Sequence, residues 1–310
     1  MLLTGFVQFP GNLHCSSETL GTEISINIGG IDVRLVFPRE KETRDENGVL
    51  LYGIRNPLIS PIGAGKWRIN GGPLDWGYPY PNNTSIISRV VIFMECNDDD
   101  VHSTAKALYS DIGRWERAFL EYCYVISKQH PLVENSFDTV GSLFHLYGDK
   151  RIDLISPDCN RQVFHLEYQI LSLDTIRKAC EYASSNCTLF LEYQLLNEAY
   201  SAFQNEKKRQ AIIDACSALE IVMVKQIKKY CDSVSMNDSI LLSKYKSFGD
   251  RVKLVQKLYP SFFVDNLEHT TVHLRNEIAH CSNFCPSDND TNTLICSVEK
   301  AMAFFHEGYY

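Results

Sequence analysis

A short stretch near the end of the chain, "HLRNEIAHCSN" (273–283), gathers side chains that can move protons and bind anions. Arginine presents a planar fork of N–H donors to oxyanions, and histidine can give or accept a proton near neutral pH. Helix surfaces are more often covered by Lys and Glu. Arg275, Asn276 and His280, with His269 and His273 before them, are therefore candidates for a functional site.

These candidates lie on a predicted helix that starts near Phe263. Its core face is predicted by an apolar series at helical spacing, namely Leu267, Thr271, Leu274 and Ile278. A polar segment, "CSNFCPSDN" (281–289), follows directly and favours fraying of the helix at His280. The sequence thus predicts a helix that ends at the candidate site.

The polar residues of this helix point in two directions. On an ideal helix one stripe, within about 40°, holds His269, His273, Asn276 and His280. Arg275 lies roughly 140° from His280. Arg275 and His280 of one chain would therefore meet only if the helix unwinds near His280. The alternative is that a second copy of the chain completes the site.

The elements that position this helix change in type along the chain. Strand patterns come first, at 23–37 around a Gly-Gly turn and at 49–54, 66–69 and 86–96, followed by a long amphipathic helix after residue 100. Later apolar series have the helical period, at 173–183, 191–203, 209–230, 250–258, 263–278 and 294–305. We predict an α+β protein, with a β-rich sensor or recognition domain at 1–170 and an all-helical bundle at 171–310.

Two features of the predicted first domain have more than one interpretation. The acidic run at 97–100 precedes the long helix, and capping of that helix is favoured over a metal site. The loop at 70–83 is rich in Gly, Pro and aromatic residues. Its rings, Trp76, Tyr78 and Tyr80, would form a recognition surface if exposed, or would simply pack the loop.

Composition restricts the class of protein. The net charge of −8 gives no global positive field, so a site for a polyanion must be a local patch. The 11 cysteines include no CxxC pair, and Cys281 and Cys285 lack a second pair of zinc ligands. We therefore expect reduced thiols, no metal and a cytoplasmic protein. No apolar run approaches ~18 residues, so no membrane span is expected.

The stretch "RNEIAH" (275–280) resembles the R-x4–6-H motif of the HEPN superfamily. "LEYQLLNEAYSAFQNEKKRQAIIDACSALEIVMVKQI" (191–227) is similar to the leading helix pair of these proteins. "FGDRVKLVQKL" (248–258) is similar to the short helix before the motif helix. The resemblance covers about residues 173–310 and is greatest to the ApeA-like branch, which is linked to abortive infection of phage-infected bacteria.

This resemblance implies a metal-independent endoribonuclease without a cofactor, active as a homodimer or higher homo-oligomer. His280 would act as general base or acid, and Arg275 would stabilise the charge of the transition state. Asn276 would orient the scissile phosphate or hold His280 in one tautomer. His269 and His273 would contact the RNA substrate. An antiphage effector or toxin is implied, with a phage-derived trigger or an antitoxin as a further partner.

Simpler interpretations apply to the same residues. Arg275 can pair with a neighbouring Glu268 or Glu277 on the helix surface. Asn276 and His280 also suit a helix C-terminus, and a histidine pair at i and i+4 is either solvated or half of a metal site. Glu220, in "SALE", can hydrogen-bond a polar partner within the bundle. The alternative function is a non-catalytic HEPN module that dimerises and binds RNA or nucleotide within a defence or toxin–antitoxin assembly.

Overall fold

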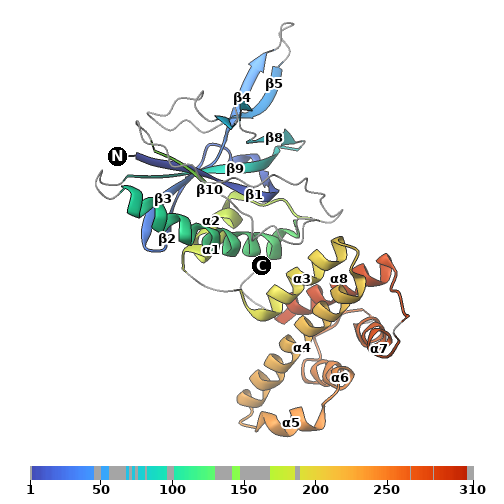
Figure 1. Ribbon diagram of the computed structural model, residues 1–310. Helices are drawn as coiled ribbons and strands as arrows, with labels where there is room; N and C mark the ends of the chain where they lie inside the picture. Colours follow the sequence, from blue (N-terminus) through green and yellow to red (C-terminus); the bar gives the residue numbers. More distant parts are fainter. Residues whose placement is uncertain are drawn as a thin grey trace. The chain divides into compact units, whose positions relative to one another are not determined.

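The computed structural model describes residues 2–44, 50–55, 68–69, 72–73, 76–80, 82–95, 101–129, 142–146, 168–185, 189–265, 267–281 and 283–305. Contacts divide the chain into two compact units, Met1–Thr188 and Leu189–Tyr310. In the described residues the first unit holds an antiparallel sheet with a long helix, and the second holds only helices (Figure 1). The predicted α+β class is confirmed.

A six-stranded antiparallel sheet forms the centre of the first unit. Its order is β10 (Ser142–Leu146), β1 (Leu2–Ser16), β9 (Thr84–Glu95), β3 (Ile31–Val36) and β2 (Glu23–Ile28), with β8 (Gly77–Tyr80) also paired to β9. Separate ribbons join β4 (Arg39–Arg44) to β5 (Leu50–Arg55) and β6 (Arg68–Ile69) to β7 (Gly72–Pro73). The predicted hairpin at 23–37 is confirmed, since β2 and β3 pair antiparallel. Gly29 and Gly30 supply the positive φ angles that its two-residue turn requires.

The long helix α1 (Val101–Ser127) packs its apolar face against the sheet. Six members of its predicted apolar series are buried, namely Ala105, Leu108, Ile112, Trp115, Phe119 and Cys123, whereas the last, Ile126, is half-buried. Phe119 stacks on Phe9 of β1 with ring centroids 5.7 Å apart. The acidic run at 97–100 lies outside the described residues, so its capping role stays a prediction.

Helix α2 (Leu173–Ser184) belongs to the first unit, although the sequence placed it in the second. Its buried face, including Ile176 and Cys180, is covered by α1 and β2. The segment before it is tied to β1, since Leu171 N donates to His14 O at 3.0 Å and Ser16 N donates to Leu171 O at 2.8 Å. The contacts divide the chain after Thr188; the sequence prediction drew the boundary at 170/171, inside a transition region of 165–190.

The aromatic loop of the first unit is only partly described. Trp76 is buried, and its ring meets Phe6 edge-on, so of the two open interpretations the packing one applies to this ring. Tyr80 is exposed and lies edge-on to His14 at 4.8 Å between centroids. The side chain of Tyr78 lies outside the described residues. Loop packing therefore accounts for Trp76.

The second unit is built around one long helix, α4 (Lys208–Ser233). It contacts the other helices: α3 (Leu191–Gln204), α5 (Asp238–Lys244), α6 (Phe248–Leu258), α7 (Leu274–His280) and α8 (Asp288–Phe305) (Figure 1). The predicted apolar series of α4 is fully buried at Ile212, Ala215, Leu219, Val222 and Ile227. None of the helices in the described part of the chain has the length and hydropathy of a membrane span.

Two details of this unit differ from the sequence prediction. In α3 the predicted core residue Leu191 is exposed, whereas Tyr193 and Leu196 are buried. The neighbouring Glu192 carboxylate is also buried and accepts two hydrogen bonds from Lys225 Nζ, at 2.6 and 2.8 Å. The Glu192 carboxylate therefore lies on the core side of α3, while its partner Lys225 stays half-exposed. Between the apolar series at 209–230 and 250–258 the sequence predicts no helix, yet α5 lies there; its apolar residues are too few to show a helical period, and none of its residues is buried.

Candidate functional site

The motif helix (267–280) consists of two kinds of helical turn. Its first part contains a π segment (His269–His273), and α7 continues from Leu274 to His280. The predicted core face is confirmed, because Leu267, Thr271, Leu274 and Ile278 are all buried. Thr271 Oγ1 donates to Leu267 O at 2.6 Å, inside the π segment. Single π turns are rare in helices and often occur at functional sites.

Arg275 points toward α4 and α6. Its guanidinium lies 3.8 Å from the Glu220 carboxylate of α4 and 5.2 Å from the centre of the Phe248 ring of α6. Glu220 also accepts a short hydrogen bond from Arg251 of α6, whose Nε donates to Tyr245 O at 3.2 Å. One carboxylate thus holds two guanidinium groups, and the cluster keeps one net positive charge. Neither Glu268 nor Glu277 takes the role that the surface-pair interpretation gave them.

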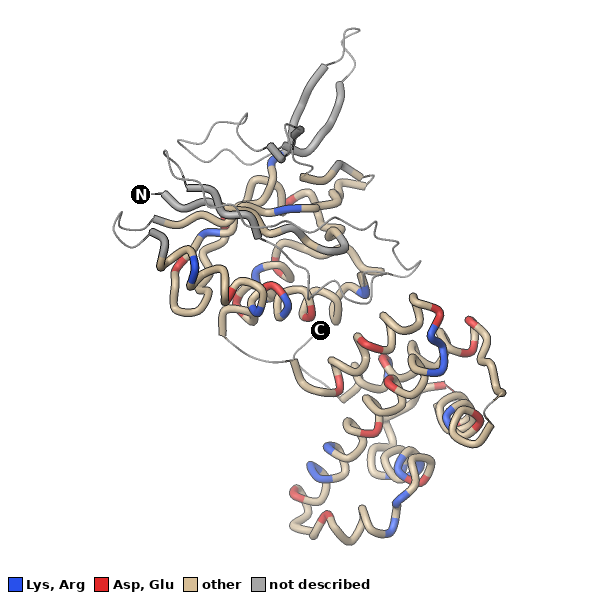
Figure 2. Tube along the Cα trace, in the orientation of Figure 1, with Lys and Arg blue, Asp and Glu red and all other residues tan. Residues whose placement is uncertain are grey.

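The cluster leaves part of Arg275 available for a ligand. The Arg275 side chain is 40% exposed, whereas that of Arg251 is only 19% exposed. Figure 2 shows basic and acidic residues interleaved along α4, α6 and α7. The excess positive charge at Arg275 is therefore local, as the acidic net charge of the chain requires for any phosphate-binding site.

Cys216 lies beneath this cluster. Its Sγ is 3.9 Å from Thr271 O, inside the bundle. Burial raises the pKa of the Cys216 thiol to about 12, although Arg275 nearby acts to lower it. A thiol that stays protonated is a poor nucleophile. Cys216 is therefore a packing residue.

Asn276 and His280 lie away from the core. Both are exposed, and in the described residues neither makes a hydrogen bond or ion pair with another side chain. The helix ends at His280, because Cys281 adopts extended backbone angles. Arg275 and His280 are not in contact within the described part of one chain. On the regular turns of α7 their five-residue spacing puts them roughly 140° apart, on separate sides of the helix.

Arg209 fixes the end of the motif helix, and sequence reasoning missed it. Its guanidinium donates to three backbone carbonyls around His280: Ile278 O at 2.9 Å, Cys281 O at 3.2 Å and Phe284 O at 2.8 Å. The sequence feature that could have identified Arg209 is the run Lys207-Lys208-Arg209 at the start of α4. Positive charge at a helix N-terminus interacts unfavourably with the helix dipole. Such a run indicates partners elsewhere, and Lys208 indeed pairs with Asp288 at 2.7 Å.

We expect Arg209→Ala to loosen the turn that carries His280. It would remove three hydrogen bonds to backbone carbonyls, although Cys281 O keeps the bond from Phe284 N at 3.3 Å, and lower the free energy of unfolding by roughly 1–3 kcal/mol. Hydrogen exchange should report faster amide exchange at 278–284. Arg177→Ala, in the first unit, is the matched control. Equal protection of 278–284 in both variants would contradict a capping role for Arg209.

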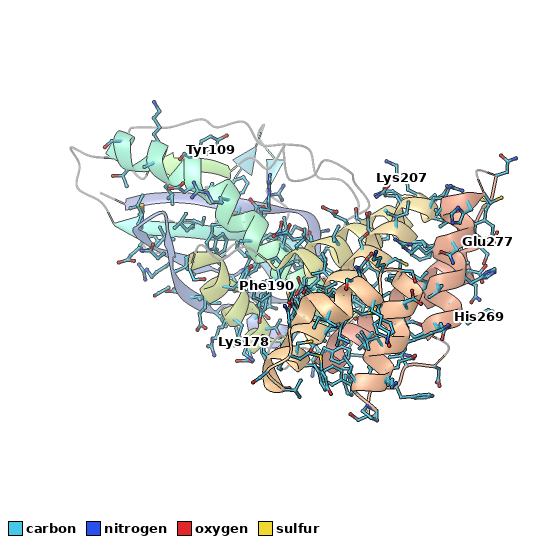
Figure 3. All side chains as sticks on the ribbon, turned by 90° about the horizontal axis from the view of Figure 1, so that it is seen from below. Tyr109, Lys178, Phe190, Lys207, His269 and Glu277 are labelled. Carbon is cyan, nitrogen blue, oxygen red and sulfur yellow. The ribbon has the colours of Figure 1, made fainter. Side chains whose placement is uncertain are left out.

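His269 and His273 extend the site toward the start of the motif helix. Both are exposed, and their rings lie 5.6 Å apart (Figure 3 labels His269). In the described residues no third His, Cys, Asp or Glu joins them to form a potential metal cluster. The pair alone supplies fewer ligands than a zinc site uses.

The comparisons with known proteins give no relative. No protein-family model, curated protein or solved structure matches the chain. The features of this chain that point to a function are the motif, its helical context and the geometry of the residues around it.

Proposed function

We propose that the second unit is a metal-independent endoribonuclease. The observation that carries the proposal is the placement of Arg275. Glu220 and Phe248 contact its guanidinium at the surface of a helix that also presents His280 to solvent, and Arg251 binds the same Glu220 carboxylate. A fixed, partly exposed guanidinium and a solvent-facing imidazole are the two groups that phosphodiester cleavage requires when the nucleophile comes from the RNA itself.

In this mechanism the RNA 2′-hydroxyl attacks its own phosphodiester. The His280 imidazole takes the proton as the O2′–P bond forms, and the P–O5′ bond breaks as the leaving oxygen takes a proton from water. The products are a 2′,3′-cyclic phosphate and a 5′-hydroxyl. Arg275 donates N–H groups to the phosphate oxygens, where negative charge increases in the transition state. Asn276 orients the scissile phosphate or the imidazole.

The proposal includes a second copy of the chain. Because Arg275 and His280 of one chain lie on separate sides of α7, a two-fold pairing of motif helices would bring Arg275 of one copy to His280 of the other. The HEPN resemblance supports the same arrangement. A homodimer is therefore part of the proposed active form.

The resemblance also supports a biological role. Cleavage of cellular RNA would stop growth, as expected of an antiphage effector or a toxin. We assign the β-rich first unit to recognition of a trigger or an antitoxin. A cytoplasmic location is consistent with the cysteines of the described residues, which are all free thiols.

The test is incubation of the purified chain with single-stranded and structured RNA in EDTA. We expect cleavage to persist, fragments to end in 2′,3′-cyclic phosphate, and DNA of the same sequence to stay intact because it has no 2′-hydroxyl. EDTA-sensitive cleavage that leaves 5′-phosphate ends would overturn the mechanism and revive His269 and His273 as a metal site. Tight RNA binding without any cleavage would favour the non-catalytic HEPN module.

A further inference from the structure

A shallow groove of about 480 Å³ lies beside the first part of the motif helix. The residues that matter for its chemistry are Phe263, Val264, Leu267, His269, Val272 and His273. We call it the histidine groove. Its lining combines an apolar floor with two imidazoles, and three of its residues belong to the π segment. Apolar surface with a few polar groups is typical of sites that bind flat organic molecules.

Phe263 is the most prominent side chain of this groove. It is 78% exposed, more than any other large apolar side chain among the described residues. Its neighbours Phe262 and Val264 are buried, so the turn at 262–264 is anchored while the Phe263 ring faces solvent. An exposed ring on an anchored turn offers a flat face for stacking.

The polar groups of the groove suit the edge of a nucleobase. Each neutral imidazole has one donor and one acceptor nitrogen, and the rings of His269 and His273 lie 5.6 Å apart. Glu268 also lines the groove, but its carboxylate is paired with Lys253 of α6 at 3.0 Å. This ion pair removes most of the negative charge that would repel a nucleotide.

The groove lies on the same face of the motif helix as His280. His273 precedes His280 by seven residues, which corresponds to about two helical turns and about 10 Å of rise. A nucleotide next to a phosphate at His280 is therefore within reach of the groove. Double-stranded RNA does not fit this chemistry, because its bases are stacked in the helix and its recognition uses phosphate and 2′-hydroxyl contacts.

We propose that the histidine groove binds one unpaired nucleobase of the RNA substrate, stacked on Phe263 and hydrogen-bonded by His269 and His273. This inference rests on the proposed ribonuclease function, because it assigns a subsite to that enzyme. It predicts a preference for single-stranded RNA, since only an unstacked base can face the Phe263 ring.

The experiment measures binding of a fluorescent single-stranded RNA octamer whose 2′-hydroxyls are methylated, so that it cannot be cleaved. We expect Phe263→Ala to weaken binding about tenfold and Phe263→Trp to retain it, since stacking on an aromatic ring contributes on this order per base. Ile240→Ala removes an exposed apolar side chain from α5 and is the matched control, with unchanged affinity expected. An RNA duplex of the same sequence should bind Phe263→Ala and the wild-type chain with equal affinity.

Other results would overturn the subsite. Unchanged binding by Phe263→Ala would do so, as would an equal loss for single strand and duplex. Conversion of a dimer to a monomer by Phe263→Ala would assign the groove to a protein interface instead. The two proposals fail separately. If the chain binds RNA through Phe263 but never cleaves it, the proposed nuclease function is wrong. If Phe263→Ala leaves RNA cleavage unchanged, only the proposed subsite is wrong.

Discussion

His280→Ala is expected to lower the rate of RNA cleavage by at least ~10²-fold, and Arg275→Ala by a similar factor. General acid–base catalysis and stabilisation of transition-state charge each contribute on that order. Neither variant should lose much stability, because His280 is exposed and the Arg275 pair is partly screened by solvent. Asn276→Ala should give a smaller loss. Single-turnover cleavage and chemical denaturation of each variant provide the two measurements.

Mixing the two inactive variants tests whether the site is composite. If Arg275 of one copy works with His280 of the other, a mixed dimer of Arg275→Ala and His280→Ala chains contains one intact site. Statistical mixing of subunits should then restore about a quarter of the wild-type rate. No recovery after verified subunit exchange would place both residues of a working site in one chain.

The stability measurement separates catalysis from architecture. His269→Ala serves as a control, since it removes an exposed imidazole from the same helix at a distance from its C-terminal end. Should His280→Ala unfold the chain while His269→Ala does not, the motif would be a structural element. A folded His280→Ala variant with wild-type cleavage would remove His280 from the mechanism.

The sequence predicts those parts of the fold that depend on local pattern. The hairpin at 23–37, the buried face of α1 and the core series of α4 follow from residue spacing and turn chemistry, and the structure confirms them. The face of α3 does not follow, because a long-range ion pair between Glu192 and Lys225 buries a charged residue. The sequence prediction grouped α2 with the later helices because its apolar residues have the helical period. That period does not show which elements pack against the helix, and in the structure α1 and β2 cover it.

The candidate site shows the same limit. The core face of the motif helix was predictable because it depends on spacing along one helix. The angular positions assumed an ideal α-helix, and the π segment changes the angle between residues at its own positions, His269–His273. Arg209, Glu220 and Arg251 reach the motif from other helices. Their partners lie tens of residues away in sequence, and no local pattern encodes such pairings.

Glu220 provides the prediction that tests this tertiary support. Glu220→Gln keeps the shape of the side chain but removes the charge that Arg251 and Arg275 share. The two guanidinium groups would then repel each other without a counter-ion, and Arg275 would lose its fixed position. We expect the rate of cleavage at saturating RNA to fall between ~10- and ~10²-fold, since displacement of a catalytic group by about 1 Å has effects of this size.

The pattern of kinetic change distinguishes positioning from simple destabilisation. Loss of the shared carboxylate should lower kcat more than it raises KM, and Glu220→Asp should recover part of the rate. Lys225→Gln is the control, because it breaks another ion pair of α4, the one with Glu192, and leaves Arg275 untouched. If Glu220→Gln and Lys225→Gln lower stability alike but neither changes kcat, Glu220 supports the bundle only. A selective fall in kcat for Glu220→Gln would instead show that α4 and α6 hold the arginine that contacts RNA.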